Sequence, residues 1–91
     1  MTTETRWLDA LDGNAIAGLL VDVFGDEMTT ADGTCANCGA RRLLAEIAVY
    51  TRGPGTVARC RSCGSVLMVF AEHRGLICVD LRGLASIEPP A

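Results

Sequence analysis

The chain has 91 residues, 49% of them hydrophobic, and a formal net charge of −3. This length accommodates one domain with a modest core, and the hydrophobic content excludes general disorder. Aromatic residues make up only 4% of the chain, which argues against the stacking platform on which proteins bind single-stranded nucleic acids.

The first part of the chain predicts one amphipathic helix. Residues 1–7 are expected to form a lead that ends at Trp7. From there to residue 24, apolar residues recur at spacings of three and four, which is the pattern of a single helical stripe. Asp12 or Asn14 can cap the start of this helix, and Gly25 stands where a C-cap glycine belongs. We therefore expect a helix over about residues 12–24, followed by a polar linker over residues 26–34.

The rest of the chain predicts a small antiparallel sheet of about four strands. The expected strands cover residues 43–51, 56–60, 65–72 and 76–81, with a turn at residues 52–55 and another at residues 73–75. A short segment over residues 84–87 follows the last strand. Helix and sheet together predict a small α+β fold.

The third expected strand is apolar on both faces, because its alternating residues are Val66, Met68 and Phe70 on one side and Leu67, Val69 and Ala71 on the other. A strand of this kind is normally covered on both faces. The apolar stripe of the N-terminal helix can cover one face, either from the same chain or from a partner chain. This pattern favours self-association.

Two matched cysteine motifs dominate the second part of the chain. They read Cys35-Ala-Asn-Cys38-Gly39 and Cys60-Arg-Ser-Cys63-Gly64, and 21 residues separate Cys38 from Cys60. A tight turn directs both sulfurs of each pair toward one point, and the glycine tolerates the positive φ of such a turn. Two such knuckles supply the four thiolates that a structural Zn²⁺ prefers.

The paired knuckles resemble those of a zinc ribbon, and nearly the whole chain is similar to an uncharacterised family of short bacterial zinc-ribbon proteins. Besides the knuckles, the matching pieces are Leu11-Asp12-Gly13-Asn14-Ala15, Ala45-Glu46, Val49-Tyr50, Pro54-Gly55 and Asp80-Leu81-Arg82-Gly83. The resemblance implies the ribbon fold and zinc ligation by Cys35, Cys38, Cys60 and Cys63. It implies no activity.

The chain divides into two parts of opposite charge. Residues 1–34 form an acidic N-terminal arm with a net charge of −6, whereas residues 35–91 carry +3 and seven arginines. The expected ribbon module spans residues 35–88, and the two parts are expected to form a single folded unit. Without a basic segment before an apolar run, the start of the chain does not resemble a signal peptide, so we expect a cytoplasmic protein with reduced thiols.

Four thiolates close the coordination shell of a metal, whereas a catalytic zinc keeps one position open. The sequence therefore predicts a structural zinc and no enzyme. A rubredoxin-like iron electron carrier is the minor alternative, although the aromatic residues and the knuckle proline typical of such carriers are missing. A disulfide oxidoreductase fits less well, since paired CxxC motifs without a thioredoxin-like pattern are typical of metal sites.

The most favoured function is a binding module that contacts a protein partner or a second copy through its helix and sheet surface. The alternative is nucleic-acid binding in transcription or translation, through arginines that cluster in sequence around the knuckles: Arg41, Arg42, Arg52, Arg59 and Arg61. Those arginines can equally offset the negative charge of a Zn(Cys)₄ site. Two further residues have plain interpretations: Cys78 is expected to be a buried, inert thiol and His73 a turn residue.

Overall fold

The structure is a computed structural model that describes residues 11–52 and 55–89. The expected lead over residues 1–7 and the centre of the expected turn at residues 53–54 lie outside the described residues. Within the described part of the chain, no helix has the length and apolar character needed to cross a membrane.

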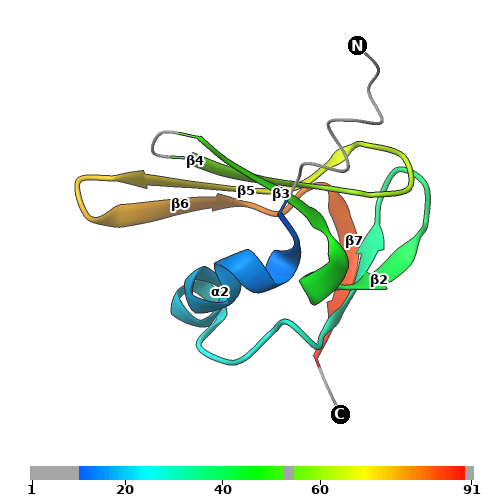
Figure 1. Cartoon of the computed structure of the whole chain (residues 1–91), viewed down its shortest axis with the longest axis horizontal. Coiled ribbons are helices and arrows are strands. Elements are labelled where there is room, and N and C mark those ends of the chain that lie inside the picture. The colour runs from blue at the N-terminus through cyan, green and yellow to red at the C-terminus, as the bar shows by residue number, and fades with distance from the viewer. Residues whose placement is uncertain (1–10, 53–54, 90–91) are drawn as a thin grey trace.

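The described residues form one short helical segment and two antiparallel sheets (Figure 1). One sheet has the strand order β3-β4-β5-β6 and the other has the order β2-β1-β7. This arrangement confirms the small α+β class and the expected antiparallel sheet of four strands, and it adds a second sheet of three strands that the sequence did not predict. In chain order the elements are η1 (Gly13–Ile16), α2 (Ala17–Phe24), β1 (Asp32–Cys35), β2 (Arg41–Leu43), η2 (Leu44–Glu46), β3 (Ala48–Arg52), β4 (Gly55–Arg59), β5 (Val66–His73), β6 (Leu76–Asp80) and β7 (Leu84–Glu88).

The predicted helix is present, with its first turn wound as the 3₁₀ segment η1 and the remainder as α2. Asp12 is the N-cap, and its side chain accepts a hydrogen bond from the main-chain N–H of Asn14 at 3.1 Å. Gly25 ends the helix with φ of 78°, and its N–H donates to the carbonyl of Val21 at 2.7 Å. Both caps could be predicted from the sequence because each depends on residues close to it in the chain.

The segment over residues 43–51, expected to be one strand, is not continuous in the structure. It is divided into β2, the 3₁₀ turn η2 and β3. The break arises because the N–H groups of Leu44 and Ala45 donate, each at 2.9 Å, to the carbonyls of Ala31 and Thr29. The turn thereby docks on the preceding loop and places Leu44 in the core, where it is fully buried.

The polar segment expected to be a linker contains the central strand of the smaller sheet. Strand β1 pairs with β2 on one side and with β7 on the other. Two leucine side chains pack closely over Gly33 in this strand, since a Cβ there would lie 2.9 Å from the Leu44 side chain and 3.1 Å from the Leu84 side chain. The strand runs across the border expected between arm and module, so residues on both sides of position 34 share one sheet.

The helix covers one face of the four-stranded sheet, so of the two alternatives the structure has the lid supplied by the same chain (Figure 1). Ile16 and Leu20 pack in the same core as Met68 and Phe70, all at most 5% exposed. The expectation that both faces of β5 are covered holds only in part. On the face away from the helix, Val69 and Ala71 remain half-buried.

Strand β6 is the most exposed apolar segment among the described strands. Leu76, Ile77 and Val79 are 71%, 37% and 39% exposed. The prediction that Cys78 is a buried thiol is wrong, since Cys78 is exposed. The reason is its position: β6 is an edge strand, and Cys78 pairs with Ala71 on the face that the helix does not cover.

Candidate metal centre

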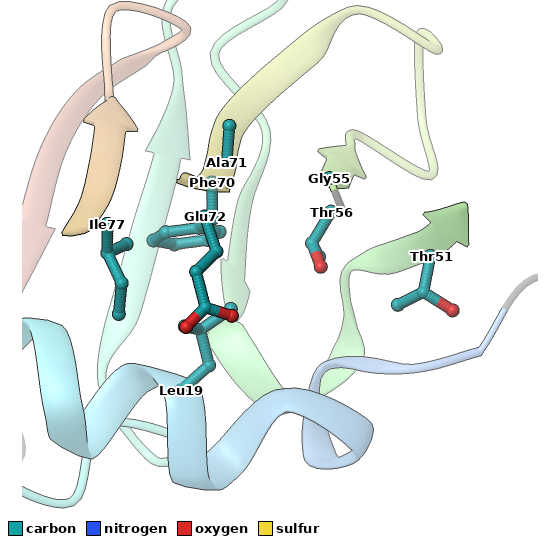
Figure 2. A pocket seen from close by; sticks show the side chains of 8 residues that line it. All are labelled: Leu19, Thr51, Gly55, Thr56, Phe70, Ala71, Glu72 and Ile77. Carbon is teal, nitrogen blue, oxygen red and sulfur yellow. The ribbon is translucent and has the colours of Figure 1, made fainter. Parts of the chain in front are cut away.

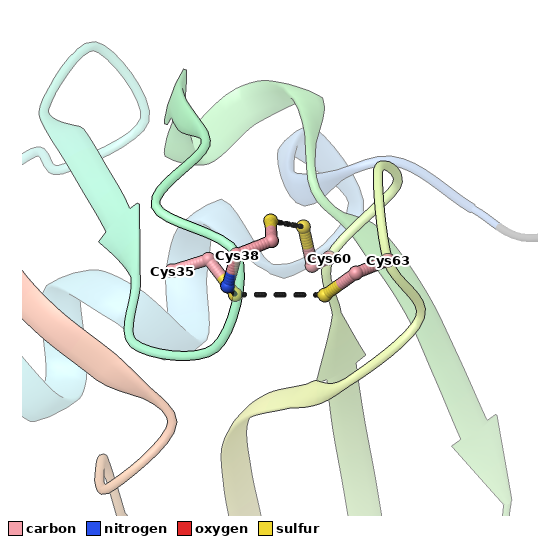
Figure 3. Close-up of side chains that lie close together, drawn as sticks. All are labelled: Cys35, Cys38, Cys60 and Cys63. Carbon is pink, nitrogen blue, oxygen red and sulfur yellow. Dashed lines mark hydrogen bonds between the residues drawn. The ribbon is translucent and has the colours of Figure 1, made fainter.

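The four cysteines of the two knuckles converge at the junction of the two sheets (Figure 3). Their sulfur atoms all lie within 4.8 Å of one another. The Sγ atoms of Cys35 and Cys63 are 3.7 Å apart, and those of Cys38 and Cys60 are also 3.7 Å apart. A tetrahedral metal with metal–sulfur bonds of about 2.3 Å requires sulfurs roughly 3.8 Å apart. The spacing therefore fits four thiolates around one metal ion.

The two knuckles have the same main-chain geometry. Gly39 donates its N–H to the carbonyl of Cys35 at 2.9 Å, and Gly64 donates to the carbonyl of Cys60 at 2.8 Å. Both glycines have positive φ, 79° and 83°, in the region that side chains avoid. The glycine after each cysteine pair was thus a correct sequence signal for the turn.

Hydrogen-bond donors surround the sulfurs and stabilise their negative charge. The main-chain N–H groups of Asn37 and Ser62 donate, each at 3.4 Å, to the sulfurs of Cys35 and Cys60. The Asn37 amide also reaches the sulfur of Cys63 at 3.4 Å. These outer contacts orient thiolate ligands in metal sites.

The Ser65 hydroxyl adds a contact between the knuckles, since its Oγ lies 3.3 Å from the Cys35 sulfur and 3.2 Å from the Cys63 sulfur. Sequence reasoning did not single out Ser65 or Asn37. The only signal for them was a polar residue inside the first knuckle and another directly after the second.

Proton affinities differ across the site. Hydrogen bonds from the Asn37 amide and from Ser65 lower the pKa of Cys63 to about 5. The N–H of Ala40 acts in the same direction on Cys38, but desolvation and the three neighbouring thiols outweigh it and raise the pKa of Cys38 to about 11. Thiols this close together do not all ionise readily, because neighbouring thiolates repel one another. A bound divalent cation would offset that repulsion.

Three of the arginines proposed for nucleic-acid contact bind the protein itself. Arg59 donates to the Gly64 carbonyl at 2.9 Å, inside the second knuckle. Arg61 donates to the Glu46 carbonyl at 2.6 Å. Arg42 donates to the hydroxyl of Ser62 at 3.3 Å. Arg42 and Arg61 therefore hold the second knuckle against β2 and η2, and Arg59 closes the knuckle onto the end of β4.

The remaining two arginines lie elsewhere. Arg41 pairs with Asp32, at 3.4 Å, and with Glu88, so it bridges the three strands of the smaller sheet. Arg52 is the last residue of β3, and its side chain lies outside the described part. His73 ends β5 beside the two-residue loop Arg74–Gly75 and is not a member of the cysteine cluster.

A cavity of about 250 Å³ lies between α2 and the larger sheet (Figure 2). Leu19 and Phe70 supply apolar surface, and the polar groups that line it belong to Thr51, Thr56 and Glu72. Its volume is below the roughly 300 Å³ at which small-molecule sites begin, and it holds a single ionisable group. We assign no ligand to it.

Fold and site together define a small α+β protein in which four cysteines could hold a metal ion. The chain belongs to a family of unknown function (DUF6510), whose model matches residues 3–91. No curated protein matched the chain in the comparison, and no solved structure did so either.

Proposed function

We propose that the protein is a non-catalytic zinc-ribbon binding module in which one structural Zn²⁺ is held by Cys35, Cys38, Cys60 and Cys63. The observation that carries this proposal is the convergence of four sulfurs within 4.8 Å of one another, with two of the sulfur pairs at 3.7 Å and hydrogen-bond donors placed around them. Thiolates favour zinc over the hard cations Ca²⁺ and Mg²⁺. Four protein ligands leave no position for a substrate or an activated water, which supports a structural rather than a catalytic role.

The metal's identity is tested on protein purified without added metal. We expect about one zinc per chain by elemental analysis and a colourless solution. Replacement by Co²⁺ should produce the absorption of a tetrahedral thiolate complex. One iron per chain, with the red colour of an oxidised Fe(Cys)₄ site, would instead favour the electron-carrier alternative.

The module's role is to present a surface to a protein partner or to a second copy of the chain. The support is the apolar edge strand β6, where Leu76 is largely exposed and Ile77 and Val79 are partly exposed. Nucleic acid is less favoured, because four of the five arginines contact main-chain or side-chain groups of the protein. The net charge of −3 also opposes a polyanion.

A salt titration separates the two classes of partner. The full chain with bound metal is mixed with single-stranded and double-stranded nucleic acids at low ionic strength, and binding is followed by fluorescence anisotropy. We expect no binding. Binding that weakens steeply as salt rises would favour the nucleic-acid function over the protein-binding one.

A further inference from the structure

The larger sheet has one edge that no described strand or bridge covers. At the opposite edge, Leu11 forms a bridge to Val49 of β3 through two main-chain hydrogen bonds. Strand β6 forms the other edge, and the described residues contain no partner for its outer side. Its residues 76–79 carry no charge, proline or bulge, which are the features that normally prevent edge strands from pairing.

The hairpin between β5 and β6 determines which main-chain groups of β6 point outward. Its loop is Arg74–Gly75, both with positive φ, 55° and 81°, and it is closed by the pair His73 and Leu76. In a two-residue loop the closing pair is hydrogen-bonded, and hydrogen-bonded and open pairs then alternate along the ladder. Leu76, Cys78 and Asp80 therefore turn their N–H and C=O toward β5, while Ile77 and Val79 turn theirs outward.

We propose that two copies of the chain associate by antiparallel pairing of β6 with β6, with Cys78 opposite Cys78 of the second copy. In this register Ile77 of each copy faces Val79 of the other as a hydrogen-bonded pair, so all four outward groups of each strand are satisfied. Shifting the strand by two residues in either direction leaves some of these groups without a strand partner. The result is one continuous eight-stranded sheet. This inference rests on the proposed function and names the second copy as the occupant of its apolar surface.

Charge supports a second copy as the occupant. The one ionised residue of β6 is Asp80, and the Arg82 guanidinium binds it at 2.7 Å. Pairing two such strands thus brings together near-neutral apolar edges and leaves Asp80 with its counter-ion. A contact limited to one short strand per copy is small, and we expect a dimer that dissociates on dilution.

Cysteine cross-linking tests the register directly. An open antiparallel pair brings its Cα atoms to about 4.5 Å, within the range that a disulfide spans. Diamide, which takes up the two electrons and two protons of the paired thiols, is added to the full chain with its metal bound, so that the four clustered thiolates are protected. We expect a disulfide-linked dimer in the unmodified chain and none in Cys78→Ser.

A second cysteine position makes the cross-linking specific for register. In the Leu76→Cys/Cys78→Ser variant, the new thiols of the two copies are separated by about four residues along the paired strands, roughly 13 Å. Leu76 is 71% exposed, so the substitution is expected to leave the fold intact. We expect no cross-linked dimer here. Equal cross-linking at positions 76 and 78 would overturn the proposed pairing.

Oligomeric state provides the independent test, by sedimentation velocity over a range of concentrations. We expect the mass to rise from that of the 9.6 kDa chain to twice that value. Val79→Lys should shift the dissociation constant upward by tenfold or more, because it places charge in the centre of the interface. Val66→Lys is the matched control: Val66 is 36% exposed against 39% for Val79 but lies at the far end of β5.

A chain that stays monomeric at millimolar concentration would overturn the dimer, as would a dimer insensitive to Val79→Lys or lacking the cross-link at position 78. If Val79→Lys fails to fold, the comparison of cross-linking at positions 76 and 78 still tests the proposed pairing of β6. The proposed function fails separately, when the chain holds no zinc or binds nucleic acid as its partner. A monomer that holds zinc and binds a different protein would overturn the proposed dimer but leave the proposed function intact.

Discussion

At the scale of single residues, two glycines are required because another segment's main chain approaches them closely. A Cβ on Gly13 would lie 1.7 Å from the carbonyl oxygen of Leu44, and a Cβ on Gly83 would lie 1.8 Å from that of Val66. Gly83 also accepts a hydrogen bond from the N–H of Ala36, inside the first knuckle, at 2.9 Å. Gly83 therefore holds the first knuckle against β5 at the junction of the two sheets.

Gly83→Ala is expected to destabilise the protein by about 1–3 kcal/mol, the usual cost of overpacking a closed site. The matched control is Gly18→Ala in α2, where a Cβ would meet no atom within 4 Å. That change should stabilise the protein by roughly 0.5–1 kcal/mol through helix propensity. Urea unfolding at saturating zinc measures both. Equal effects of the two substitutions would contradict the close approach at Gly83.

Asn37 is the residue through which the first knuckle influences a cysteine of the second. Its amide donates to the Cys63 sulfur and is the largest cause of that thiol's lowered pKa. Removing the amide in Asn37→Ala should raise the Cys63 pKa. Protons then compete better with the metal, so zinc should be released at a higher pH and bound about 10–100-fold more weakly.

A competition titration with a zinc-binding dye, repeated from pH 7 to pH 4, measures this effect. Asn14→Ala serves as the control, because Asn14 is an exposed residue at the start of the helix, remote in sequence from both knuckles. The idea fails if both variants release zinc over the same pH range as the unmodified chain.

At the scale of elements, the helix owes its stability to packing rather than to its own length. With its eight residues, α2 is shorter than helices that persist alone in water. Its central Leu20 is fully buried beneath the larger sheet, in the same core as Phe70. Tertiary contact therefore decides whether this segment is helical.

Leu20→Ala should destabilise the protein by about 2–5 kcal/mol, because it removes a fully packed side chain and leaves a cavity. Val21→Ala, one residue further along the same helix, should cost under about 1 kcal/mol because Val21 is 42% exposed. Thermal unfolding followed by circular dichroism compares the two. A similar loss in both variants would show that the helix is not anchored through Leu20.

At the scale of the whole molecule, the four-cysteine cluster joins the two sheets. The first knuckle begins at the end of β1 in the smaller sheet, and the second begins directly after β4 in the larger one. A metal bound to all four sulfurs would fasten both sheets at one point. Such a staple is effective in a chain of 91 residues, whose core is modest.

Cys60→Ser is expected to abolish zinc binding and to remove the cooperative unfolding transition, since ligand thiolates converge only in the folded chain. Cys78→Ser removes the one cysteine outside the cluster and should retain zinc and folding. Zinc content and a calorimetric scan of each variant provide the measurement. A folded Cys60→Ser chain with an unchanged melting temperature would contradict the structural role of the metal.

The sequence by itself determined the features that depend on near neighbours. The helix over residues 12–24 followed from apolar spacing and from the cap residues Asp12 and Gly25. The two knuckles followed from the offset of cysteine and glycine, because a five-residue turn closes through its own hydrogen bond. Local geometry therefore leaves these segments few alternative main-chain conformations.

Only the tertiary structure decided the features that depend on distant segments. The polar residues before Cys35 became the central strand of a sheet because β2 and β7 pair on either side of them. Cys78 is exposed because β6 is the edge strand of its sheet, although the apolar neighbours of Cys78 in the sequence predict burial. Strand pairing is set by non-local hydrogen bonds, and a strand's own residues do not specify which neighbour, if any, will cover it.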